Sequence, residues 1–385
     1  MSDARPGPRR VLLTGDDFYA SLAMVRALRA GGYSPVLAAA ERDTYAGRSR
    51  AVDAVVRVPS ADESPGRFAA AVAAAAREQG VSAVLPGNET ALIALARHRD
   101  SLPVPLGAPP TTVVDLATDK ARVLQLAAGH GFEAPPSTSG RPAELRARAD
   151  SFSYPAILKP PRTILRLDDD RLTCLNVSRI DSPDAMRTAL APLPDLEWVV
   201  QPYVRGQLGA VAGVAWEGSV YGSVHQVARR IWPRDAGYSC YAETIPRDPR
   251  LDEQVAGLVR SLRWSGIFQL QMLRRPGASR LLIDFNPRPY GSLWLAVHAG
   301  ANLPAAWAEL VHGVAPAPIR YRVGARYRLE HHDLYAIASM FRDGDVRPAL
   351  SALVPRPRTG HAVFSWRDPK PLITAANKLR RRRMR

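Results

Sequence analysis

Apolar positions in the first hundred residues alternate between short continuous runs and helical spacing. Residues 11–15 form an apolar run that ends in a turn, and residues 18–30 repeat apolar side chains at helical spacing before Gly31 and Gly32. The pattern then repeats, with strands expected at 35–38, 54–58 and 81–85 and helices at 66–79 and 89–99. This alternation predicts a parallel, doubly wound sheet, which we assign as a Rossmann-like domain over residues 1–108.

The turn after the first strand lacks the glycine pattern of dinucleotide-binding proteins. It reads Thr14-Gly15-Asp16-Asp17-Phe18, and its two acidic residues would repel a pyrophosphate. The rest of the chain is predicted to be α+β. A helix opens at Asp119-Lys120 and stops near Gly129, and β-rich segments extend from residue 154 to residue 286. Helices are also expected at 307–312 and near 334–340.

An apolar strand ending in Asp-Phe-Asn-Pro-Arg carries the strongest chemical signal. Side chains two apart in a strand share a face, so Asp284 and Asn286 should point the same way. Leu282 should point with them, while Ile283 faces the core. A carboxylate beside an amide oxygen suits a hard cation such as Mg²⁺. Arg288 extends beyond the strand end toward the same site.

The preceding strand adds further oxygen donors to this face. A four-residue loop over 276–279 would place Gln271 opposite Asp284 and Gln269 opposite Asn286. Three or four oxygen donors would then lie beside an arginine. The alternative is a solvent-facing pair of polar strands joined by a turn, which the same alternation also produces.

Lysine is rare in this chain, which has only four lysines among its 52 basic residues. Lys159 closes an apolar strand, and Lys120 opens a helix after Asp119. A lysine at a strand end is usually only solvated. However, an ammonium group suits phosphate oxygens, and two of them would stabilise the charge that develops in phosphoryl transfer.

A third segment, residues 197–206, is a strand that runs into an extended hinge. Its backbone groups would be able to read an adenine edge, although any strand leaving a sheet looks similar.

The net charge of +16 invites a nucleic-acid interpretation, but its distribution argues against one. The arginines are scattered except at residues 378–385, which we expect to form a solvated, disordered tail, the alternative being contact with an acidic lipid or polyanion surface. No apolar stretch approaches the ~20 residues of a membrane span, so a soluble cytoplasmic protein is expected. Cys174 and Cys240 are predicted to be buried or idle thiols, and residues 331–333 (His-His-Asp) to have a structural or surface role.

Taken in order, these motifs resemble the ATP-grasp superfamily, including carbamoyl phosphate synthetase and its carboxylate–amine ligase relatives. The resemblance covers residues 10 to about 313. It implies a Rossmann-like pre-ATP-grasp domain followed by a two-subdomain ATP-grasp fold. The implied divisions are the pre-ATP-grasp domain at 1–108, the small or lid subdomain at 109–198, the catalytic subdomain with the metal site at 199–318, and a C-terminal extension with its basic tail at 319–385.

The resemblance also implies roles for individual residues. Those expected to bind ATP are Lys120, Lys159, Gln201, Pro202, Tyr203, Val204 and Gln207. The magnesium ligands would be Gln271, Asp284 and Asn286, holding two Mg²⁺ ions, with Mn²⁺ as a substitute. Arg288 would steady the γ-phosphate or an acyl phosphate, and it would act with Lys159 as a catalytic residue.

Three positions depart from the family pattern. The segment after Lys159 usually carries a glycine-rich loop, but residues 160–170 contain no glycine and suggest a short hairpin turning at 168–170. Where an acid normally holds the ribose hydroxyls, only Gln207 is present. Asp284 replaces the commoner glutamate, and its shorter side chain still serves a metal.

The implied activity is ATP-dependent joining of a small-molecule carboxylate to an amine through an acyl phosphate. Arg230 or Arg234 would hold the substrate carboxylate through a bidentate contact. The alternatives are a carbamoyl phosphate-type phosphotransfer enzyme and a non-catalytic ATP-binding scaffold. No nucleic-acid partner is expected, and a homodimer remains open.

Overall fold

The first sheet contains four parallel strands in the order β3-β2-β1-β4. The computed structural model describes residues 9–15, 18–234, 237–275, 277 and 279–383. The strands of this sheet are β1 (Arg10–Thr14), β2 (Ser34–Ala39), β3 (Ala54–Arg57) and β4 (Val84–Leu85), and the helices between and after them are α1 (Tyr19–Ala30), α2 (Pro65–Glu78) and α3 (Glu89–Arg97). The predicted parallel sheet is therefore confirmed, whereas the expected turn residues Asp16 and Asp17 lie outside the described residues.

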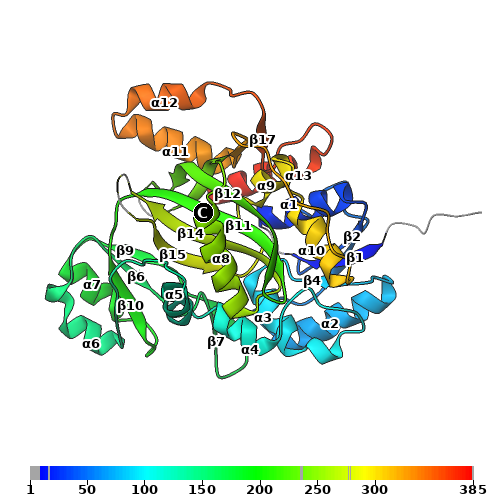
Figure 1. Ribbon diagram of the computed structural model, residues 1–385, viewed down its shortest axis with the longest axis horizontal. Helices are drawn as coiled ribbons and strands as arrows, with labels where there is room; N and C mark the ends of the chain where they lie inside the picture. The colour runs from blue at the N-terminus through cyan, green and yellow to red at the C-terminus, as the bar shows by residue number, and fades with distance from the viewer. Residues whose placement is uncertain (1–8, 16–17, 235–236, 276, 278, 384–385) are drawn as a thin grey trace, which may run out of the picture.

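A smaller antiparallel sheet follows, in the order β5-β10-β6-β9, and lies beside the large sheet with α6 and α7 (Figure 1). Two helices, α4 (Thr111–Ala117) and α5 (Lys120–Ala128), lead into it. Its strands and helices are β5 (Thr138–Gly140), α6 (Pro142–Ala147), β6 (Ala156–Lys159), β9 (Ser178–Ile180), α7 (Pro183–Leu190) and β10 (Trp198–Pro202). Because β10 is central in this sheet, the small subdomain extends past the expected division at residue 198.

Seven strands form the large sheet, in the order β15-β14-β11-β12-β13-β16-β17. These strands are β11 (Gln207–Trp216), β12 (Ser219–Trp232), β13 (Tyr238–Thr244), β14 (Gly266–Arg274), β15 (Leu281–Asn286), β16 (Arg326–Arg328) and β17 (Thr359–His361). Helix α8 (Pro249–Leu262) covers one face, and α9 (Leu293–His298) and α10 (Leu303–Val311) pack on the other. The C-terminal segment thus supplies two strands of this sheet. It also forms α11 (Glu330–Arg342), α12 (Val346–Leu353) and α13 (Lys370–Arg383). None of the helices within the described residues is long and apolar enough to cross a membrane.

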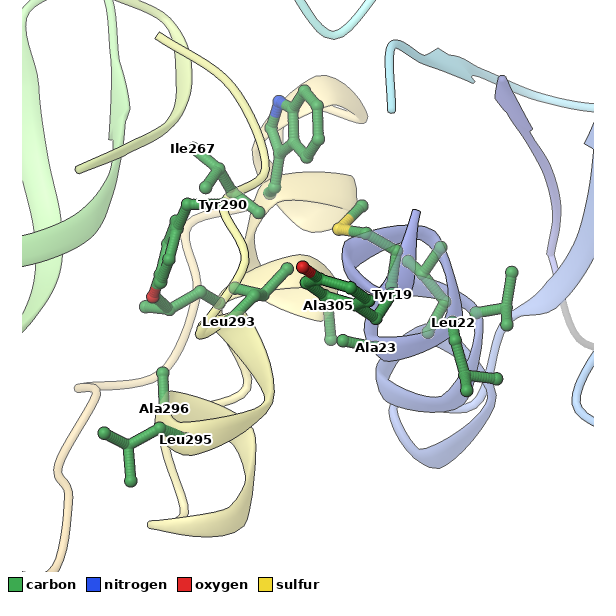
Figure 2. Packing of buried hydrophobic residues seen from close by; sticks show 14 of the residues in the cluster. Tyr19, Leu22, Ala23, Ile267, Tyr290, Leu293, Leu295, Ala296 and Ala305 are labelled. Atoms are coloured by element: carbon green, nitrogen blue, oxygen red, sulfur yellow. The ribbon is translucent and has the colours of Figure 1, made fainter. Parts of the chain in front are cut away.

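A shared core joins the N-terminal domain to the large sheet. Figure 2 shows Tyr19 and Ala23 of α1 facing the segment that carries Tyr290 and Leu293, which directly follows β15. These four side chains are almost fully buried, and burial of a side chain the size of leucine contributes roughly 1.5–3 kcal/mol. The packing therefore holds the carboxyl ends of the N-terminal strands near the end of β15.

The pairing of β14 with β15 confirms the predicted register and corrects one side chain. Gln271 lies opposite Asp284 and Gln269 opposite Asn286, but the register then shifts and pairs Met272 with Leu282. This β-bulge leaves Ile283 as the extra residue. Leu282 is consequently buried in the core, so the prediction that it shares the face of Asp284 is wrong. Of the expected loop, positions 276 and 278 lie outside the described residues.

Candidate active site

Amide and carboxylate side chains form a row on one face of β14 and β15. Alternation places Gln271, Asp284, Gln269 and Asn286 on this face. The Gln271 Nε2 atom donates to the Gln269 Oε1 atom at 3.3 Å, and the Gln269 Nε2 atom donates to the Ser292 hydroxyl at 3.4 Å. Because each nitrogen donates along the row, the Gln271 carbonyl oxygen is left as a potential cation ligand. The donor set consists of hard oxygens, which fits Mg²⁺.

Lys120 meets Asp284 at this row. Its Nζ atom lies 3.5 Å from the Asp284 Oδ1 atom, and both side chains are largely buried. Lys120 is the first residue of α5, where Asp119 caps the helix by accepting from the Arg122 N–H at 3.1 Å. The Lys120 N–H donates to the Pro161 carbonyl at 3.1 Å. This bond ties the start of α5 to the segment directly after Lys159.

Lys159 reaches the same strand from the end of β6. Its Nζ atom donates to the Ile283 carbonyl at 3.2 Å. Ile283 is the bulged residue of β15, and a bulge leaves backbone groups outside the ladder that a side chain can bind. Burial lowers the Lys159 pKa to about 8, and Asp284 opposes that shift. The Lys159 ammonium is therefore held beside the polar row of β14 and β15, where it loses part of its hydration.

Sequence reasoning missed one carboxylate, Glu89. It is the first residue of α3, which begins after Asn88 caps the helix by accepting from the Ala91 N–H at 2.8 Å. The Arg288 Nε atom donates to the Glu89 Oε2 atom at 3.2 Å. Burial raises the Glu89 pKa, Arg288 opposes this, and Asp284 adds to it. The sequence signal that could have identified Glu89 was its position just after β4, because binding sites form at the carboxyl ends of parallel strands.

The hinge between the two sheets uses most of its own backbone donors. Gln201 pairs with Ile157 inside the small sheet, and its buried Nε2 atom donates to the Ser137 hydroxyl at 2.8 Å. Pro202 has no N–H, and the Tyr203 N–H donates to the Pro155 carbonyl at 2.8 Å. Among the four predicted hinge residues, Val204 is left as the donor for an adenine edge.

Comparisons with known proteins identify similar folds. Residues 195–332 match the family model ATPgrasp_Ter, described as ATP-grasp in the biosynthetic pathway with Ter operon. The L-amino acid ligase from Bacillus licheniformis superimposes with a TM-score of 0.60 at 16% identity, covering 80% of this chain and 74% of that one. N5-carboxyaminoimidazole synthetase from Staphylococcus aureus, complexed with ADP, gives 0.61 at 12%, covering 83% and 81%. No curated protein sequence matches the chain.

A third solved structure is similar as well. The biotin carboxylase domain dimer of 2-oxoglutarate carboxylase from Hydrogenobacter thermophilus, in complex with MgADP, gives a TM-score of 0.62 at 14% identity. The match covers 82% of this chain and 73% of that one. This chain has the ATP-grasp fold. The resemblance inferred from the motifs is therefore confirmed at the level of the fold.

One residue expected to bind ATP lies on the face of the large sheet opposite Gln271. Gln207 pairs with Arg274, and Gly209 pairs with Met272, so both belong to the face opposite Gln271. Met272 is in the core beneath α8. The expectation that Gln207 holds the ribose is therefore not supported, because strand alternation directs its side chain away from the polar row that contains Gln271 and Asp284.

Both arginines proposed for the substrate carboxylate already pair with acidic residues of this chain. Arg230 contacts both Asp333 oxygens, at 2.6 and 3.0 Å, and Asp333 is almost fully buried. Arg234 pairs with Asp343 at 2.6 Å and with Asp345 at 2.7 Å. Asp333 thus has the structural role expected of residues 331–333, while a substrate role for either arginine stays a prediction. Across the described residues, no group of three or more His, Cys, Asp or Glu side chains is arranged for a metal.

The segment after Lys159 forms the short hairpin that the sequence suggests. Strands β7 (Ile164–Arg166) and β8 (Leu172–Cys174) pair antiparallel, and Asp170 adopts a φ of 67° in the turn between them. At the base of this hairpin, Arg162 pairs with Asp119 at 3.3 Å. In this ATP-grasp fold, an arginine and the α5 cap therefore anchor the hairpin near Lys120. Cys174 and Cys240 are both free thiols.

Proposed function

We propose that this ATP-grasp protein is an ATP- and Mg²⁺-dependent ligase that joins a small-molecule carboxylate to an amine through an acyl phosphate. The observation that carries the proposal is the convergence of Lys120 and Lys159 on Asp284 and its neighbour Ile283. These groups come from the linker helix, the small sheet and the large sheet. Their meeting point combines cations for phosphate with hard oxygens for a metal.

ATP would lie between the two sheets. The Val204 N–H would read the adenine edge, and Lys120 and Lys159 would hold phosphate oxygens. Asp284, Asn286 and Gln271 would hold Mg²⁺, which would supply charge neutralisation for the transferred phosphoryl group. Two of the solved structures with this fold are complexes with ADP or MgADP, which supports a nucleotide in the same place.

Arg288 would stabilise the acyl phosphate. Its guanidinium is held by Glu89 from the N-terminal domain at 3.2 Å, so the two domains together fix its direction. A fixed cation near the developing charge lowers the barrier because no reorganisation is needed during reaction. The hairpin β7–β8, anchored next to Lys120, would shield the labile mixed anhydride from water.

A coupled ADP-release assay over carboxylates and amino acids with Mg²⁺ tests the proposal. Release that needs an acid and an amine together supports the ligase. Hydroxylamine should replace the amine and yield a hydroxamate, because it traps an acyl phosphate. Release with bicarbonate and a nitrogen donor, without a larger acid, would instead indicate a carbamoyl phosphate-type enzyme.

A non-catalytic ATP-binding scaffold is the second candidate. The glycine-free hairpin favours it, since residues 160–170 offer phosphate no close approach of glycine backbone. Under this alternative, Mg-ATP binds with no ADP release for any acid–amine pair. The same assay, combined with calorimetric titration of ATP, separates the two candidates.

A further inference from the structure

A cavity of about 490 Å³ opens on the large sheet away from the row of metal ligands. Its lining includes Gln207 and Gly209 of β11, Arg229 of β12, Arg274 of β14, and Asp248 and Arg280 from the loops beside them. Gly209 and Met272 pair on the face opposite Gln271, and Leu251 of α8 lines the same space. We call this space the back-face cavity. Its volume is in the range of sites for small molecules.

Three arginines surround the back-face cavity, and two of them have acidic partners. Arg229 pairs with Glu243 at 3.0 Å, and Arg280 pairs with Asp248 at 2.6 Å. Within the part of the chain that the structure describes, the Arg274 side chain makes no hydrogen bond and no ion pair. Burial lowers its pKa, the charges of Arg280 and Arg229 lower it further, and the Asp248 carboxylate opposes the shift. Because Asp248 pairs with Arg280, the half-buried Arg274 guanidinium has no ion-pair partner of its own among the described residues.

The backbone leaves space for this arginine. A Cβ atom at Gly209 would lie 2.9 Å from the Arg274 Cδ atom, so the stem of Arg274 crosses β11 where there is no side chain. Glycine inside a strand weakens it, and such a position often marks a place where another group must approach closely. The glycine therefore allows Arg274 to lie along the sheet and bring its charge to the cavity.

We propose that the back-face cavity binds a small anion, a carboxylate or a phosphoryl group, with Arg274 as its main contact. A guanidinium presents paired donors that match either group, and Arg229 and Arg280 add positive potential. The N-terminus of α8 also faces this region, although Asp248 already caps it. Gly209, Met272 and Arg274 belong to the face opposite Gln271, so the Arg274 site is distinct from the proposed nucleotide site.

Isothermal titration of the full chain with inorganic phosphate and with succinate tests the proposal. Arg274→Ala should weaken binding of at least one of them about tenfold or more, as expected for loss of a charged hydrogen-bonding group. Gly209→Val keeps every charge but displaces the Arg274 stem, so it should weaken the same anion. Arg67→Ala is the matched control, since Arg67 is an exposed arginine of α2.

The outcomes are distinct. Arg274-dependent binding of phosphate alone identifies a phosphoryl ligand, and Arg274-dependent binding of succinate identifies a carboxylate. Anion binding that is equal in the wild type and in Arg274→Ala overturns the proposal, because the ions then bind elsewhere, such as at Lys120 and Lys159. Absence of binding of both probes at about 10 mM overturns it as well. Circular dichroism of each variant checks that the fold is kept.

Discussion

The Lys120 ammonium lies 3.5 Å from the Asp284 carboxylate and so connects α5 to the last strand of the metal row. The proposed function assigns one group to phosphate and the other to Mg²⁺. Binding of Mg-ATP would then exchange this ion pair for contacts with the nucleotide and the metal. Because the pair is largely buried, each partner is pre-positioned and the exchange involves little new desolvation.

Replacing Asp284 by Asn should abolish Mg²⁺-dependent ADP release while leaving the fold intact. The carboxylate is the only formal charge among the three predicted ligands, and loss of such an electrostatic contact is expected to lower turnover about 100-fold or more. The measurement is the coupled assay with the best acid–amine pair. Asp195→Asn is the control, because Asp195 is an exposed carboxylate that pairs with Arg141 on the small subdomain. Normal turnover in the Asp284 variant would refute the metal assignment.

ATP affinity should fall as the pH rises through about 8. Burial lowers the Lys159 pKa to about 8, so its ammonium is charged at neutral pH and loses its proton above that value. One lost proton weakens binding up to about tenfold per pH unit above the pKa. Calorimetric titration of ATP between about pH 7 and about pH 9 measures this.

Lys159→Arg should remove that inflection, since a guanidinium does not titrate in this range. Lys159→Met should bind ATP more weakly and with a flat profile. A wild-type profile that is itself flat through about pH 8 would mean that the Lys159 ammonium does not contact the nucleotide.

Glu89→Gln should gain stability relative to the wild type as the pH rises. Burial raises the Glu89 pKa in the folded state above its ordinary value of 4.5. The stability linked to this proton is present below the unfolded pKa and is lost as the pH rises through the folded pKa. Urea unfolding at about pH 4 and about pH 7 should therefore show a larger variant-minus-wild-type difference at the higher pH. A difference that shrinks with pH would contradict the raised pKa.

Asp333→Asn should destabilise the large sheet by about 3 kcal/mol or more, because it leaves buried arginine charges without a partner. Asp333 accepts from Arg230 at 2.6 Å and lies 2.8 Å from Arg328. Asp343→Asn is the matched control: its contact with Arg234 is exposed, so the expected loss is about 1 kcal/mol or less. Urea denaturation measures both. Equal effects of the two substitutions would show that burial of Asp333 does not matter.

Strand alternation explains why the row of polar side chains on β14 and β15 was predictable. Gln271 and Asp284 belong to one local hairpin, and a period of two residues sets their shared face from the sequence alone. The bulge was not predictable in the same way. It depends on how Leu282 and Phe285 fit the core beneath α8, and that core is assembled from distant segments. The direction of the Gln207 side chain was also not predictable, because it is set by the pairing of Gln207 with Arg274 of β14 and not by its distance along the chain from the hinge.

The sequence by itself determined the alternation of strands and helices in the first hundred residues, the parallel first sheet and the shared face of Gln271, Asp284 and Asn286, because these follow from periodicity within short segments. Only the tertiary structure decided which charges meet there. Glu89 and Arg288 are 199 positions apart, and their contact exists because α1 packs against the segment after β15. Likewise, Arg230 is bound to Asp333 because β16 and α11 complete the far side of the large sheet. Such contacts depend on long-range packing, which no local pattern encodes.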